Sequence, residues 1–105
     1  MKEIADRDFN REVLNCHIPI LACFVTRWCH SCYSMCLLIH KLVKEYEGKV
    51  KFVKVNIKEI PNISAGHRVI AVPTILIYKH SQLVKTLIGF QDRTSLRALL
   101  DSIAT

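Results

Sequence analysis

The order of apolar and polar residues along the chain predicts a series of strands. Residues 20–25 (ILACFV) form an uninterrupted apolar run, which is typical of a central strand covered on both faces. Runs rich in β-branched and aromatic residues predict two more strands over residues 50–57 and 74–78. A fourth run, residues 83–88, follows the polar turn 79–82, so the last two strands are predicted to pair as a hairpin.

Apolar residues at helical spacing predict helices between and after these strands. A short helix is expected over residues 8–14, and residues 61–67 are expected to form a loop or a short helix. Two longer apolar stripes predict two longer helices: Met35, Leu38, Ile39, Leu42, Val43 and Tyr46, stopped by Gly48; and Leu96, Leu99, Leu100 and Ile103. The order βαβ then ββα predicts one α/β domain over residues 1–105, with a mixed sheet of four to five strands and helices on both faces.

Composition narrows the classes of protein that fit. Half of the residues are hydrophobic and 23% are charged, which favours a folded domain over a disordered chain. No apolar run approaches the roughly 20 residues of a membrane span, and residues 1–8 lack the apolar region of a signal peptide, so we expect a cytoplasmic protein. The formal charge of +6 comes from scattered lysines and arginines, which indicates a solvated basic surface rather than a nucleic-acid site.

The segment Trp28-Cys29-His30-Ser31-Cys32 lies where the first apolar strand gives way to a helical pattern. The CxxC spacing brings both sulfur atoms to the first turn of that helix, where unpaired N–H groups and the helix dipole stabilise a thiolate. This pattern is the signature of dithiol–disulfide chemistry, although a CxxC alone is equally compatible with zinc.

Four features together resemble the thioredoxin family, over essentially the whole chain. The segment 28–32 matches the family's Trp-Cys-Gly-Pro-Cys, and Lys54-Val55-Asn56-Ile57 looks like the end of its central strand. Val72-Pro73-Thr74 looks like its cis-proline loop, and Gly89 matches a glycine that flanks the active site. The resemblance implies a thioredoxin fold and a protein-disulfide reductase.

The resemblance also implies how the reaction runs. Cys29 is expected to be the nucleophile that forms a mixed disulfide with the substrate, and Cys32 the thiol that resolves it. No cofactor or metal is expected beyond the Cys29–Cys32 disulfide itself. The implied partners are protein disulfides and a thioredoxin reductase, and the implied state is a monomer.

Substrate binding is expected around four residues. Pro73 is expected to be cis and to lie against the cysteines, which leaves the backbone of Val72 to pair with an extended substrate segment. Trp28 is expected to form a wall of the site, and Gly89 to flank it.

Three substitutions depart from the family pattern. Cys23 stands where family members commonly bury an aspartate, and a buried thiol is a poor base. We therefore expect slower resolution by Cys32, with Lys54 as the remaining nearby ionisable group, although Cys23 also fits a plain core role. His30 and Ser31 replace Gly-Pro.

The replaced dipeptide bears on the reduction potential. A protonated His30, with Arg27 nearby, favours the thiolate and so predicts a more oxidising disulfide, as in an oxidase- or isomerase-like variant. The alternative is that His30 is an exposed residue with no large effect.

Other interpretations remain open at this level. Cys29, Cys32 and Cys36 are spaced like ligands of a zinc or iron–sulfur module, although helical continuity would turn Cys36 away from Cys29. Cys36 otherwise fits core packing, and Cys16 an incidental thiol. A third possibility is a binding module that keeps the cysteines and reduces little.

Overall fold

A five-stranded mixed sheet forms the centre of the molecule, with the order β1-β3-β2-β4-β5. The computed structural model describes residues 1–14, 16–57 and 69–104. β1, β3 and β2 run parallel to one another, while β4 is antiparallel to both β2 and β5. The strands are β1 (Lys2–Ala5), β2 (Ile20–Val25), β3 (Lys51–Asn56), β4 (Thr74–Lys79) and β5 (Gln82–Ile88). The predicted mixed α/β sheet is confirmed.

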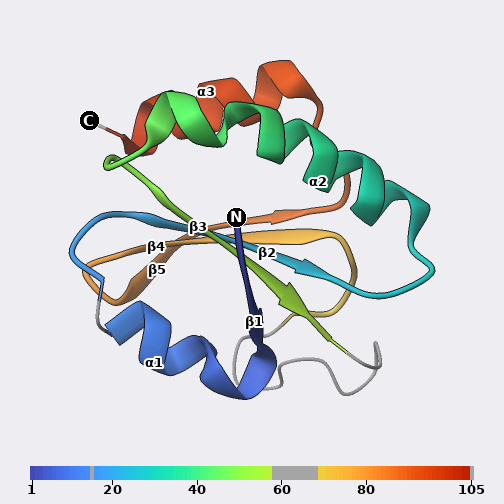
Figure 1. Ribbon diagram of the computed structural model, residues 1–105, viewed down its shortest axis with the longest axis horizontal. Coiled ribbons are helices and arrows are strands. Elements are labelled where there is room, and N and C mark those ends of the chain that lie inside the picture. The colour runs from blue at the N-terminus through green and yellow to red at the C-terminus, as the bar shows by residue number, and fades with distance from the viewer. Residues whose placement is uncertain (15, 58–68, 105) are drawn as a thin grey trace.

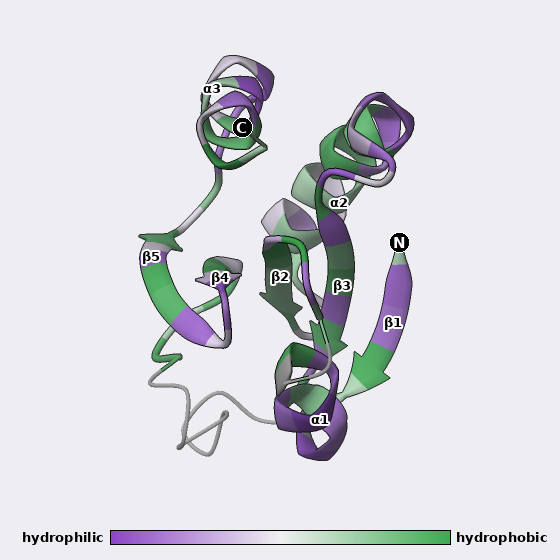
Figure 2. Ribbon diagram, turned by 90° about the vertical axis from the view of Figure 1, so that its left-hand side faces the viewer, coloured by the Kyte–Doolittle hydropathy of each residue, from purple (hydrophilic) through white to green (hydrophobic). Residues whose placement is uncertain are grey.

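Helices cover both faces of this sheet. α1 (Phe9–Leu14) packs on one face, and α2 (His30–Leu42) and α3 (Arg93–Ile103) lie on the other. Figure 2, seen at a right angle to Figure 1, shows these helix layers on opposite sides of the strands. A short 3-10 segment, η1 (Asp6–Asp8), precedes α1. A second one, η2 (Val43–Tyr46), follows α2. None of the helices in these described ranges is long and apolar enough to cross a membrane.

β2 has the bounds predicted for it, and all six of its residues are buried. Its residues alternate between two apolar cores because successive side chains of a strand point to opposite faces. Leu21, Cys23 and Val25 join the core under α2 and α3, whereas Ala22 and Phe24 join the core under α1. Segment 28–32 follows shortly after this strand, so it lies at the end of the central part of the sheet.

The sequence did not predict β1, because Lys2–Ala5 lacks an apolar run. β1 is instead held in the sheet by its pairing with β3. Glu3 lies opposite Lys54 in register, and the two side chains form an ion pair of 3.3 Å. The long middle helix also differs from the prediction. The α-helix ends at Leu42 and continues as the 3-10 segment η2. Gly48, with a φ of +80°, follows this segment.

The predicted hairpin of β4 and β5 is confirmed. Its two turn residues, His80 and Ser81, both have positive φ values of 52° and 66°, the backbone twist that suits a tight hairpin. The loop or short helix expected over residues 61–67 lies outside the described residues.

Candidate active site

Cys29 and Cys32 form a disulfide at the N-terminus of α2, with their Cα atoms 5.2 Å apart. Cys29 is the N-cap of the helix, and its Sγ accepts a hydrogen bond of 3.2 Å from the backbone N–H of Cys32. The hydroxyl of Ser31 lies 3.6 Å from the same sulfur. These donors and the positive end of the helix dipole favour negative charge on Cys29.

The two cysteines differ in access. Cys32 is only 2% exposed and belongs to the core under α2, whereas Cys29 is half-buried at its edge. Trp28, immediately before Cys29, is 98% exposed and has a φ of 60°. A bulky residue rarely adopts this left-handed backbone, and such strain is concentrated at functional sites.

An open hollow begins at this disulfide and continues along α2. It is lined by residues from the end of β2, from α2 and from β3, among them Arg27, Trp28, Cys29, Cys32, Cys36 and Lys54. Of the residues predicted for the site, Trp28 and Lys54 are therefore brought together with both cysteines. His30 and Ser31 form the first turn of α2, and the side chain of His30 faces solvent.

The loop before β4 also reaches this region. The Val72–Pro73 peptide bond is cis, as expected, and Pro73 is buried. The Pro73 carbonyl accepts a hydrogen bond of 2.8 Å from the N–H of Gly89, whose φ of 93° suits glycine. Val72 packs against the same apolar cluster as Cys29. The fold thus places the predicted docking residues Val72, Pro73 and Gly89 beside the disulfide end of the sheet.

Beneath the disulfide lies a second pair of thiols. Cys23 is fully buried on β2, opposite Lys54 in the register of the sheet, and Cys36 of α2 packs against the same apolar core. The hydrogen bond with Cys36 and the burial raise the pKa of Cys23 well above the usual thiol value. Cys23 therefore stays neutral, as the sequence suggested.

Cys36 packs against the core, as expected, but it is only half-buried and also lines the open hollow. The hydrogen bond from Cys23, aided by the charge of Lys54, lowers the pKa of Cys36 to about 7, against the opposing effects of burial and of Glu3. The sequence gives two signals for the pair Cys23 and Cys36: the i, i+4 spacing of Cys32 and Cys36, and the position of Cys23 in a central strand. Neither signal predicts that Cys23 and Cys36 lie close together across the core.

A metal centre has no support in the described part of the chain. No group of three or more His, Cys, Asp or Glu side chains there is arranged to hold an ion. Cys29 and Cys32 are joined in a disulfide, and Cys36 is a free thiol that packs against the core and does not complete a ligand set with them.

Comparison with known proteins decides the family. The family model described as Thioredoxin matches residues 1–102. The chain is 38% identical over 93 residues to the thioredoxin of Rickettsia felis, covering 89% of each chain. It is 32% identical over 99 residues to thioredoxin 1 of a Nostoc species, covering 94% of this chain and 92% of that protein. The thioredoxin of Pyropia yezoensis is 31% identical over 101 residues, covering 96% and 94%.

The chain belongs to the thioredoxin family. This thioredoxin-family protein is a thiol–disulfide oxidoreductase that acts through a CxxC pair, Cys29 and Cys32, and proteins of the family need no cofactor. Its fold and general activity are those that the sequence resemblance implied. The zinc, iron–sulfur and oxidase-like alternatives are not favoured by these findings.

Proposed function

We propose that this protein reduces disulfides of other proteins, with Cys29 as the nucleophile and Cys32 as the resolving thiol. The observation that carries the proposal is the contrast between the two sulfur atoms. Cys29 is the more accessible one and receives the N–H of Cys32 at the helix N-terminus, whereas Cys32 is buried. An accessible thiolate attacks first, and the adjacent buried thiol then releases the reduced substrate.

The substrate segment docks between Trp28 and the Val72–Pro73 loop. Among the described residues, no backbone hydrogen bond uses the N–H or carbonyl of Val72, so its peptide groups suit an extended strand added beside the disulfide. The side chain of Trp28, almost fully exposed, offers an apolar surface next to Cys29. Gly89 flanks this docking site and supports the loop through its hydrogen bond to Pro73.

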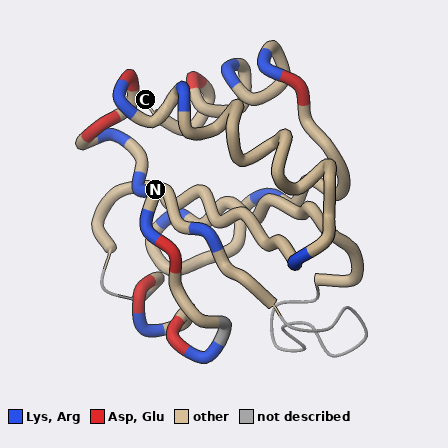
Figure 3. Tube along the Cα trace, turned by 45° about the vertical axis from the view of Figure 1, so that its right-hand side comes forward, with Lys and Arg blue, Asp and Glu red and all other residues tan. Residues whose placement is uncertain are grey.

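The protein works as a monomer in the cytoplasm, and a thioredoxin reductase returns the Cys29–Cys32 disulfide to the dithiol. Three further cysteines, Cys16, Cys23 and Cys36, are free thiols, which persist best in a reducing compartment. Protein substrates and not nucleic acids are the partners, since basic and acidic positions are intermixed over strands, helices and turns (Figure 3).

Trapping of a mixed disulfide tests the assignment of the two cysteines. Cys32→Ser should accumulate a covalent adduct with insulin through Cys29, because no thiol remains to resolve it, whereas Cys29→Ser should form none. Cys16→Ser is the matched control and should reduce insulin like the native chain. An adduct formed equally well by Cys29→Ser would reverse the assignment.

The direction of electron flow is tested separately. With NADPH and a thioredoxin reductase, the native protein should reduce insulin over many turnovers. A chain that forms the trapped adduct but does not turn over under these conditions would be a binding module or would depend on another reductant.

A further inference from the structure

Cys36 and Cys23 lie together in a part of the molecule that the reaction of Cys29 and Cys32 does not use. Both side chains pack in the apolar core under α2. Lys54 lies opposite Cys23 on the neighbouring strand and lines the same open hollow as Cys36, so the two thiols face each other between β2 and α2. Their accessibility differs sharply, because Cys23 is fully buried and Cys36 is half-buried. Like Cys29 and Cys32, this pair therefore combines one accessible sulfur with one buried sulfur.

Cys36 is open to small molecules from two sides. It lines the hollow that begins at Cys29 and also a second one formed by Met1, Tyr33, Leu37, His40 and Lys54. Tyr33 and Lys54 line both hollows, so the thiol of Cys36 lies at the boundary between them. Access at this position suits a small reagent rather than a folded protein.

The groups that face Cys36 come from three strands and from its own helix. β2 contributes the thiol of Cys23, β3 the ammonium group of Lys54, and β1 the carboxylate of Glu3, which is paired with Lys54 at 3.3 Å. On α2, His40 lines the second hollow. The net result is a thiolate-favouring site, since the pKa of Cys36 falls to about 7. A low-pKa, accessible cysteine next to a second thiol is the usual arrangement of a redox-sensing cysteine.

We propose that Cys36 and Cys23 form a second redox couple, in which Cys36 reacts with a small hydroperoxide and Cys23 closes a disulfide. The Cys36 thiolate attacks one peroxide oxygen, so that an S–O bond forms and the O–O bond breaks. The departing oxygen takes a proton from water and leaves as an alcohol, or as water when the oxidant is hydrogen peroxide. Cys36 becomes a sulfenic acid.

Cys23 completes the second step. As its thiol loses a proton, its sulfur attacks the sulfur of the Cys36 sulfenic acid, an S–S bond forms, and the hydroxyl leaves as water. In total the hydroperoxide gains two electrons and the two thiols lose two electrons and two protons. The product links α2 to β2 beneath the Cys29–Cys32 disulfide, and an added dithiol reverses it.

The experiment isolates this pair from every other cysteine. In the variant Cys16→Ser/Cys29→Ser/Cys32→Ser only Cys23 and Cys36 remain, and Arg27 lies between them, so that trypsin separates them into residues 12–27 and 28–41. After treatment with hydrogen peroxide, mass spectrometry without reduction should show these two peptides joined. Dithiothreitol should separate them.

A second variant tests the order of the two steps and provides an internal control. In Cys23→Ser/Cys29→Ser/Cys32→Ser the disulfide cannot form, so the sulfenic acid on Cys36 should persist and react with dimedone. Cys16 is also free and half-buried in this variant, and its thiol donates to the carbonyl of Ile18 at 3.3 Å. Dimedone should label Cys36 about tenfold more than Cys16 at pH 7.

Two results would overturn the proposal. Equal labelling of Cys16 and Cys36 would show that Cys36 has no special reactivity. Separate peptides after peroxide treatment would show that Cys23 does not form a disulfide with Cys36. Circular dichroism verifies that each variant is folded. Because both variants lack Cys29 and Cys32, the outcome does not depend on the roles assigned to those residues.

Discussion

In the proposed reaction, the reactivity of Cys29 follows from its position as the N-cap of α2. The backbone N–H of Cys32 and the hydroxyl of Ser31 both lie near its sulfur, at 3.2 Å and 3.6 Å. These contacts act on the thiolate of Cys29 and not on the disulfide. We therefore expect the dipeptide between the cysteines, His30-Ser31, to influence how oxidising the pair is.

Exchange of this dipeptide should change the reduction potential. In His30→Gly/Ser31→Pro the thiolate loses two favourable neighbours, so the reduced form is less stable and the potential should become more negative by about 30 mV or more. Equilibration with glutathione measures this change. His80→Gly, in the turn at the other end of β4, is the control and should leave the potential unchanged. An equal or higher potential in the double variant would contradict the role of His30 and Ser31.

Cys23 should limit the release of substrate. It is neutral and lies opposite Lys54, so the side chain at position 23 offers no carboxylate to accept the proton of Cys32. In Cys23→Asp the mixed disulfide on Cys29 should therefore decay faster, by about tenfold or more. Stopped-flow measurement of mixed-disulfide lifetimes tests this expectation. Cys23→Ala, which adds no base, should match the native lifetime, and an unchanged lifetime in Cys23→Asp would refute the idea.

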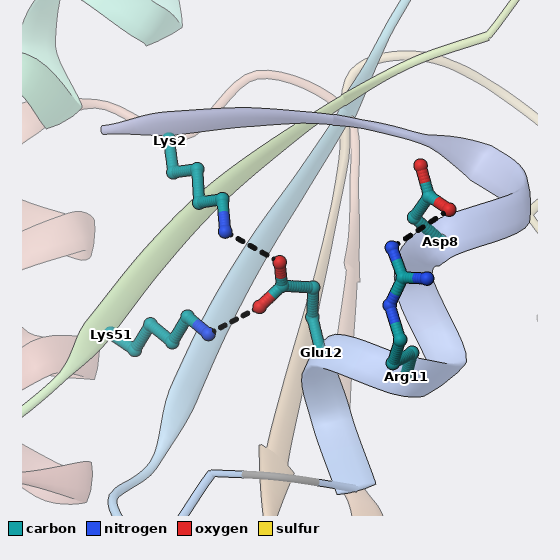
Figure 4. A network of polar contacts seen from close by, with 5 residues as sticks. All are labelled: Lys2, Asp8, Arg11, Glu12 and Lys51. Atoms are coloured by element: carbon teal, nitrogen blue, oxygen red, sulfur yellow. Dashed lines mark hydrogen bonds and ion pairs between the residues drawn. The ribbon is translucent and has the colours of Figure 1, made fainter.

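At the scale of elements, α1 is tied to the sheet by one carboxylate. Figure 4 shows Glu12 between the ammonium groups of Lys2 on β1 and Lys51 on β3, with distances of 2.6 Å and 2.7 Å. The hydrogen bonds from Lys2 and Lys51 lower the pKa of Glu12 from 4.5 to about 2. A neighbouring pair, Asp8 and Arg11, lies at 3.1 Å on the exposed side of the helix.

Loss of the Glu12 charge should weaken the fold in a pH-dependent way. Because the folded pKa lies below the unfolded one, the stabilisation is complete above pH 4.5 and is lost as the pH falls toward 2. Glu12→Gln should therefore lower the free energy of unfolding at pH 7 by about 1–2 kcal/mol, a value reduced for the solvent exposure of Lys2.

Urea unfolding at pH 7 and near pH 2 measures this difference. The deficit of Glu12→Gln should shrink at the lower pH, because the carboxyl of Glu12 is then protonated in the unfolded state and about half protonated in the folded state. Glu47→Gln, at an exposed position after η2, is the control and should change stability little at either pH. A deficit that is equal at both pH values would mean that packing, and not charge, explains the effect.

At the scale of the whole molecule, one sheet is shared by two apolar cores. Phe9 of α1 is fully buried on one face, where its ring lies 5.3 Å from those of Phe24 and Tyr78. Leu100 of α3 is fully buried on the other face. Since β2 contributes side chains to both cores, damage to either core should destabilise the whole domain.

Single truncations on the two faces should give matching results. Phe9→Ala should lower the free energy of unfolding by about 3–5 kcal/mol and Leu100→Ala by about 2–5 kcal/mol, each with one cooperative transition. Denaturant titration followed by circular dichroism measures both. Leu37→Ala, at a position that is 46% exposed, should cost much less. Two transitions in place of one in either variant would show that the cores unfold independently.

The sequence by itself determined four of the five strands, the long helices and the class of chemistry at the CxxC pair. Strands and helices of this kind depend on residues that are close together in the sequence, so a short-range pattern is enough to predict them. Examples are the apolar run of β2, the apolar stripes of α2 and α3, and the CxxC spacing. The match of Val72-Pro73-Thr74 to a family motif added the docking loop. β1 was missed because an edge strand of mixed polarity is ordered by its partner strand and not by its own residues.

Only the tertiary structure decided which distant side chains meet. Cys23, Cys36 and Lys54 come from β2, α2 and β3, and their contact depends on strand register and on how α2 packs over the sheet. The ion pairs of Glu12 likewise join α1 to two strands. The pKa values of such groups depend on burial and on neighbours within a few ångströms, which no local pattern in the sequence specifies.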